Sequence, residues 1–106
     1  MNKIYNKLVR DKIPEIIEAT GDLYVTEILS DEKYIEMLNL KLNEECSEYQ
    51  ENKNIEELAD ILEVIYAIAN IHGISAEQLE NIRVEKANKR GRFENKILLK
   101  EVIKQG

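Results

Sequence analysis

The chain has 106 residues, of which 43% are apolar and 34% charged, with one proline and four glycines. This length and composition predict one globular domain over residues 1–106 with a small core, and they exclude a disordered or fibrous protein. The longest mainly apolar run, residues 61–71, is too short to cross a bilayer, and the net charge of −6 argues against a general nucleic-acid-binding surface.

The N-terminal residues and the single cysteine give expectations about the compartment. Residues 1–12 lack the long apolar stretch of a secretory signal, and Cys46 alone cannot form an internal disulfide. We therefore expect a cytoplasmic protein with no membrane segment. Cys46 itself is expected to be a small core residue rather than a nucleophile, because no histidine partner is evident.

The charges are distributed unevenly along the chain. Residues 27–63 carry 12 acids and 3 bases, whereas residues 83–104 carry 8 bases and 3 acids. An acidic middle followed by a basic section predicts either mutual neutralisation or a site that holds cations and anions together.

The first half of the chain predicts two helices around one extended segment. Asp11 is expected to cap a short helix over residues 13–20, which ends at Gly21. Residues 23–29 (LYVTEIL) have the composition of a strand, although one such segment cannot form a sheet without a partner. Ser30 or Asp31 then begins a long helix that extends to about residue 50.

The second half predicts two helices with capping-box starts. Asn54 with Glu57 begins a helix that ends at Gly73, and Ser75 with Gln78 begins one that ends at Gly91. Residues 96–104 fit either a last helix or an extended arm. Because short connections favour antiparallel neighbours, we predict an all-α antiparallel helix bundle with one short extended segment near its N-terminus.

Four acids repeat a three-residue spacing on two of these helices. At about 100° per residue, Glu45 and Glu57 fall on the apolar faces, whereas Glu48 and Asp60 lie on the flanks. Carboxylates in such positions repel one another unless they are paired or bound to a cation, and Mg²⁺ prefers oxygen ligands. The spacing therefore fits a Mg²⁺ site between two facing helices. It also fits a solvated acidic face, with Glu57 explained as a capping-box acid.

The last predicted helix presents a row of cations. Arg83, Lys86 and Arg90 lie on one face at i, i+3 and i+7, with Lys89 beside them. Such a face suits a metal-bound polyphosphate. Alternatively, these cations complement the helix macrodipole near its C-terminus, and spacing alone does not decide between the two.

Three blocks of sequence resemble one protein family. The strings EECSE (44–48) and EELAD (56–60) are similar to the EExxE…ExxD signature of the all-α nucleoside triphosphate pyrophosphohydrolases. This is the MazG-like superfamily, which also includes phosphoribosyl-ATP pyrophosphohydrolase and dimeric dUTPases. Residues 6–21 (NKLVRDKIPEIIEATG) and 86–102 (KANKRGRFENKILLKEV) resemble its small branch, regarded as house-cleaning enzymes for noncanonical nucleotides. Together the blocks cover nearly the whole chain.

The resemblance implies an activity and a site. The activity is Mg²⁺-dependent hydrolysis of a nucleoside triphosphate between the α- and β-phosphates, giving a nucleoside monophosphate and pyrophosphate, with Mn²⁺ as a substitute ion. Lys86 and Arg90 match the basic block and would contact phosphates. Glu44 is an added acid that would orient water or a ligand. By position, the metal ligands would be Glu45, Glu48, Glu57 and Asp60.

The resemblance also implies assembly between subunits, as a homodimer or homotetramer. Residues 58–69 support this independently, because their apolar side chains occupy more than one face of a helix. Two departures from the family pattern concern the substrate: eight residues separate Glu48 from Glu57, and Arg92 replaces a glycine that is common there. The rival reading is a non-catalytic helical module that senses a nucleotide or binds a basic protein partner.

Overall fold

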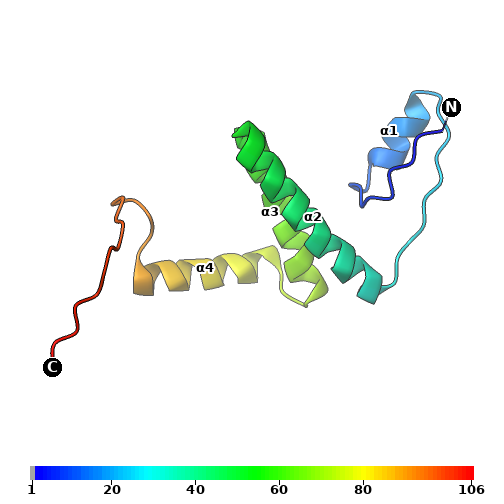
Figure 1. The fold of residues 1–106 in the computed structure, drawn as a ribbon. Coiled ribbons are helices and arrows are strands. Elements are labelled where there is room, and N and C mark those ends of the chain that lie inside the picture. The colour runs from blue at the N-terminus through cyan, green and yellow to red at the C-terminus, as the bar shows by residue number, and fades with distance from the viewer. Residues whose placement is uncertain (1) are drawn as a thin grey trace.

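The computed structural model describes residues 2–106, and within that range it contains four helices and no strand (Figure 1). The all-α class is therefore confirmed. The segment 22–30 is extended but pairs with nothing, as expected for a single strand-like segment. The helices are α1 (Ile13–Ala19), α2 (Asp31–Asn52), α3 (Ile55–Ile71) and α4 (Ala76–Arg90).

Helix α1 begins one residue later than a cap at Asp11 requires. Lys12 occupies the N-cap position and makes no side-chain capping bond, while Asp11 lies in the preceding turn. The prediction that Asp11 caps this helix was wrong. The turn is closed instead by the backbone, because the N–H of Ile13 donates to the carbonyl of Arg10 at 3.0 Å. The predicted end is confirmed, since Gly21 follows with φ +86°.

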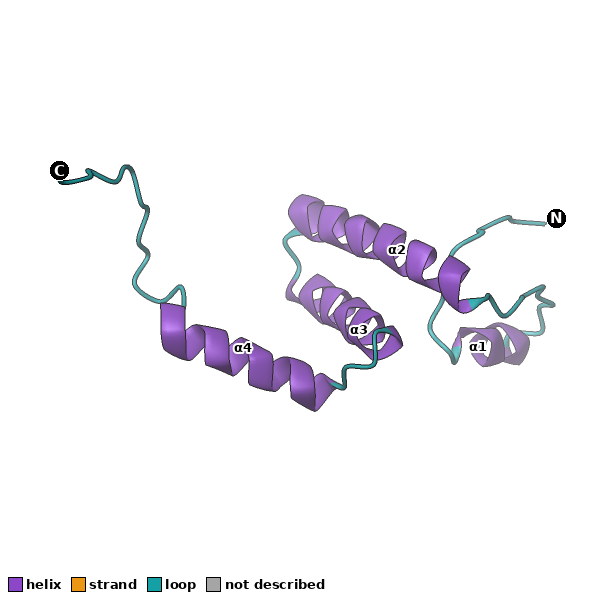
Figure 2. Cartoon of the chain, turned by 90° about the horizontal axis from the view of Figure 1, so that it is seen from below, coloured by secondary structure: helices purple, strands orange, loops and turns teal. Residues whose placement is uncertain are grey.

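Helices α2 and α3 form an antiparallel pair that holds the core (Figure 2). Ser30 caps α2 as predicted, accepting from the backbone N–H of Lys33. The link to α3 has only two residues, Lys53 and Asn54, with Lys53 in the left-handed conformation at φ +55°. The residues buried in this pair include a carboxylate: they are Leu38, Val64 and Glu45.

Helix α3 ends in a Schellman motif at Gly73. The N–H of Ile74 donates to the carbonyl of Ala69 and that of Gly73 to the carbonyl of Asn70, at 2.9 Å each. Ser75 and Gln78 then form the predicted capping box of α4. Both predicted boundaries are confirmed.

Helix α4 does not run antiparallel to α3, as the predicted bundle requires. Its axis is bent by 106° from that of α3, and among the helices it contacts only α3 (Figure 1). Few of its side chains are even half-buried, so little apolar surface holds it against the α2–α3 pair. The expected bundle is therefore not completed within one chain.

The C-terminal part of the chain extends away from the helices (Figure 1). Residues 96–104 form an extended arm rather than a helix, and all residues after Arg90 are exposed. The radius of gyration is 19.2 Å, against about 13 Å for a compact chain of this length. Within residues 2–106, no single helix has the length and apolarity to span a bilayer; α3 and α4 meet that test only when joined across their bend.

Candidate metal centre

The α2–α3 pair brings five predicted acids together. One carboxylate oxygen from each of Glu45, Glu57 and Asp60 lies within 4.8 Å of the others, and the same holds for Glu44, Glu45 and Glu48. Glu45 belongs to both groups. The short link between the helices brings these carboxylates together, because it places the Glu45 turn of α2 opposite the Glu57 turn of α3. We call these five residues the acid cluster.

Glu45 is the buried member of the acid cluster. It is 7% exposed, as the helical wheel predicts for a residue on the apolar face of α2. Burial raises the pKa of its carboxyl, and the neighbouring Glu48 carboxylate raises it further. The Lys41 ammonium, with Nζ 3.4 Å from Glu45 Oε1, opposes that shift. An ionised Glu45 is therefore costly here unless another cation compensates it.

Glu57 carries an orphaned oxygen. Its Oε2 is buried and has no hydrogen-bond partner among the residues described, which is rare for a buried polar atom. The capping-box prediction for this residue was wrong, since the Asn54 side chain accepts from the N–H of Glu56 and the Glu57 carboxylate does not bond back to the cap. Helix capping therefore does not explain why an acid occupies position 57. An unsatisfied carboxylate oxygen beside Glu45 and Asp60 fits an oxygen-preferring divalent ion.

Two cations from the N-terminal segment reach the acid cluster. Lys7 Nζ lies 2.9 Å from Glu44 Oε1, and Arg10 Nη2 lies 2.7 Å from Asp60 Oδ1. The hydrogen bond from Lys7 holds the pKa of the Glu44 carboxyl below its usual range, and Glu44 raises the pKa of Lys7 in turn. Sequence reasoning missed both cations. The only available signal was their place in the block NKLVRDK, and helical periodicity cannot locate a residue on an irregular segment.

The cations of α4 lie apart from the acid cluster in the single chain. Arg83 pairs with Glu80 on its own helix, through Nε at 3.0 Å, and Lys89 pairs with Glu85 at 3.4 Å. The Arg83 guanidinium holds the pKa of Glu80 below its usual range. Helix α4 does not contact α2, which carries most of the acids. A phosphate-binding role for Arg83, Lys86, Lys89 and Arg90 stays a prediction.

Cys46 is exposed, so its predicted place in the core was wrong. It follows the buried Glu45 on α2, and one helical residue turns the side chain by about 100° from the face that packs on α3.

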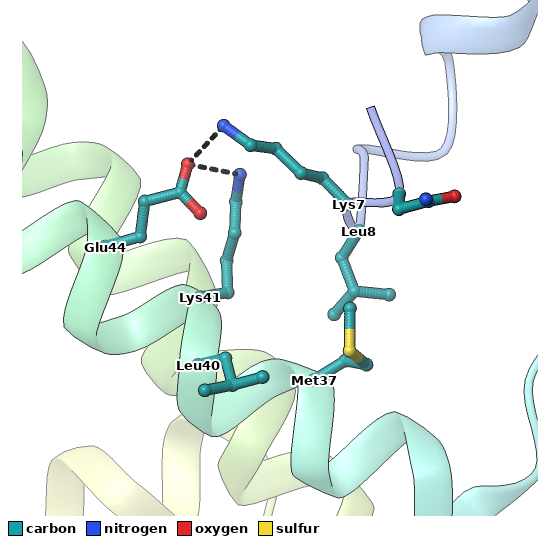
Figure 3. Close-up of a pocket in the computed structure, with 7 residues that line it drawn as sticks. Lys7, Leu8, Met37, Leu40, Lys41 and Glu44 are labelled. Atoms are coloured by element: carbon teal, nitrogen blue, oxygen red, sulfur yellow. Dashed lines mark hydrogen bonds and ion pairs between the residues drawn. The ribbon is translucent and has the colours of Figure 1, made fainter. Parts of the chain in front are cut away.

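A small open pocket borders the acid cluster (Figure 3). Its volume is about 150 Å³, below the range of about 300–1,000 Å³ that is usual for ligand pockets. A whole nucleotide would therefore extend beyond it. The lining residues come from the N-terminal segment and from α2: Asn6, Lys7, Leu8, Met37, Leu40, Lys41 and Glu44.

Comparisons with known proteins give one short match. No family model matches the chain, and no solved structure matches it. Over 42 residues the chain is 50% identical to a protein of Mycolicibacterium smegmatis (strain ATCC 700084 / mc(2)155) that is described only as uncharacterized. The match covers 40% of this chain and 43% of that relative, so the chain spans less than half the length of the curated relative.

Proposed function

We propose that this protein is a Mg²⁺-dependent nucleoside triphosphate pyrophosphohydrolase of the MazG-like superfamily. It would hydrolyse a noncanonical nucleoside triphosphate to the monophosphate and pyrophosphate. The observation that carries the proposal is the convergence of Glu45, Glu57 and Asp60, with the buried Glu57 Oε2 left without a partner. The resemblance of residues 44–60 to the EExxE…ExxD signature supports the same reading.

The proposed mechanism assigns separate tasks to the acids. Glu45, Glu48, Glu57 and Asp60 would hold the ion, and binding it would relieve the repulsion among them. When bound, Mg²⁺ neutralises phosphate charge and lowers the pKa of a coordinated water. Glu44, which Lys7 keeps ionised, lies at the edge of the group and accepts a hydrogen bond from the attacking water.

The test is a substrate panel. The protein is incubated with Mg²⁺ and with ordinary, oxidised, deaminated and deoxy nucleoside triphosphates, and pyrophosphate is measured against orthophosphate. We expect pyrophosphate from at least one substrate. Asp60→Asn should lower its release at least a hundredfold with the helical content unchanged, whereas Glu63→Gln, an exposed acid on the same helix, should not. Release of no product from any substrate, with Mg²⁺ or Mn²⁺, would contradict the proposal.

A non-catalytic role is the second candidate, and one observation favours it. Lys7 and Arg10 already pair with Glu44 and Asp60, so the acid cluster is able to bind basic segments without any ion. Under this reading the protein senses a nucleotide or binds a basic partner. Retained nucleotide binding without pyrophosphate release from the panel would support it.

A further inference from the structure

The N-terminal segment lies at the acid cluster on two sides. Lys7 meets Glu44, from α2, and Arg10 meets Asp60, from α3, so the segment bridges both helices that supply the acids. Within residues 2–106, these are the cations that lie within ion-pair distance of the cluster from outside α2 and α3. The inference drawn from this arrangement rests on the proposed function.

The position of the segment depends on apolar contact as well as on charge. Leu8 is half-buried, and it shares a pocket with Met37 and Leu40 on α2; Figure 3 shows Leu8 and Met37 directed toward each other. Asn6 has φ +48°, a left-handed conformation that asparagine adopts more readily than most residues. Leu8 therefore lies against α2 beside the acids, in addition to the two ion pairs.

Lys7 and Arg10 keep donors free for a further ligand. Their side chains are 53% and 58% exposed, and Arg10 uses only Nη2 in its contact with Asp60. Exposed ion pairs contribute little to stability, so exchanging one partner for another costs little. The remaining N–H groups of a guanidinium form a planar fork that matches the oxygens of a phosphate.

Charge balance favours such residues. A polyphosphate brings several negative charges to a place where five carboxylates already lie, and a metal ion neutralises only part of that total. We infer that Lys7 and Arg10 are phosphate-binding residues of this site, which take oxygens of a metal-bound polyphosphate while the acid cluster holds the metal.

Calorimetry on the 106-residue chain tests this inference with inorganic tripolyphosphate, which has no base to recognise. We expect Lys7→Gln and Arg10→Gln each to weaken tripolyphosphate binding in Mg²⁺ at least tenfold. The affinity of both variants for Mn²⁺ alone should stay within threefold of the wild-type value or become higher, because a cation that competes with the ion for the acids is removed. Arg10→Lys should recover part of the loss. The matched control is Lys12→Gln, an exposed cation two residues from Arg10, which should change neither affinity.

Three results would overturn the inference. One is unchanged tripolyphosphate affinity in both variants. A second is an equal fall in Mn²⁺ affinity, which would mean that the two cations only shape the acids. The third is a fall in tripolyphosphate affinity that occurs only in the α4 variants Lys86→Gln and Arg90→Gln. That result would assign phosphate binding to α4. If wild type releases pyrophosphate and any of these is found, only this inference fails; if wild type binds neither Mn²⁺ nor tripolyphosphate, both proposals fail.

Discussion

For Glu57, the role predicted from the local sequence differs from the role that its position in the fold indicates. Its place three residues after Asn54 predicts a capping bond, yet its Oε2 is buried and unpartnered beside Glu45 and Asp60. The cap is provided without it, since Asn54 accepts from the N–H of Glu56. The side chain is thereby left free to point toward α2.

The first prediction concerns this carboxylate. Millimolar Mg²⁺ should raise the Tm of the wild-type protein by about 5 °C, because ion binding stabilises only the folded state. Glu57→Gln should raise the Tm without metal, since it removes a partly buried negative charge from beside two other acids, and it should abolish the response to Mg²⁺. Glu51→Gln, an exposed acid on α2, serves as the control and should respond as wild type does. A Glu57→Gln protein that is less stable yet still responds would contradict this account.

Glu45 and Glu44 are adjacent, and their pKa values are shifted in opposite directions. The folded-state pKa of Glu45 is raised above its unfolded value of about 4.3, so this group stabilises the fold below that value and the contribution is lost as the pH rises through the folded pKa. The pKa of Glu44 is lowered, so its contribution is present above the unfolded value and is lost as the pH falls through the folded pKa.

The second prediction follows from the Glu45 shift. In EDTA, the free energy of unfolding of Glu45→Gln, relative to wild type, should increase between pH 4 and pH 7, because the variant does not have to ionise a buried group as the pH rises. Urea unfolding at several pH values measures it. A difference that stays flat over this range, or that shrinks with rising pH, would show that burial does not control the titration of Glu45.

At the scale of the helices, Gly73 ends α3 and sets the start of the turn into α4. Its φ is +82°, and a Cβ added there would meet no atom within 4 Å, so any cost of substitution comes from the backbone alone. We expect Gly73→Ala to lower the free energy of unfolding by about 1–2 kcal/mol, the usual cost of a left-handed residue with a Cβ. Gly73→Asn should cost less, because asparagine tolerates this region. Equal losses in both variants, measured in urea, would point to another cause.

Capping signals explain what could be predicted from the sequence about these elements. Ser30, Ser75 with Gln78, and Gly73 mark boundaries that depend on nearby backbone groups only, so their positions could be predicted. The inward faces of α2 and α3 followed from apolar periodicity, which placed Glu45 correctly. The direction of α4 and the place of Lys7 and Arg10 could not be predicted, because they depend on contacts between distant residues that no local pattern encodes.

At the scale of the whole molecule, much apolar surface is left uncovered. Extents of 69 × 32 × 23 Å describe an open chain, and Leu38 and Val64 are its buried apolar residues within the range described. On α3 and α4, Leu62 and Ile82 remain 45% and 47% exposed. Apolar side chains exposed in this way are available for contact with another protein surface.

The last prediction is that the protein is a homodimer or homotetramer at micromolar concentration. Leu62→Glu and Ile82→Glu should each shift sedimentation toward the monomer, because a charge placed in an apolar contact is strongly disfavoured. Asn43→Glu, at an exposed polar position on α2, is the control and should leave the assembly intact. Wild-type protein that sediments only as a monomer would contradict the prediction.

The two-residue link between α2 and α3 acts as a spacer for the acid cluster. It fixes the register in which the Glu45 turn faces Glu57 and Asp60, although neither Lys53 nor Asn54 is itself an acid. Inserting one residue there would leave both helices intact and keep every local acidic spacing, yet it would slide one helix along the other and separate the carboxylates. The length of this loop is therefore as important to the candidate metal centre as the identity of its acids.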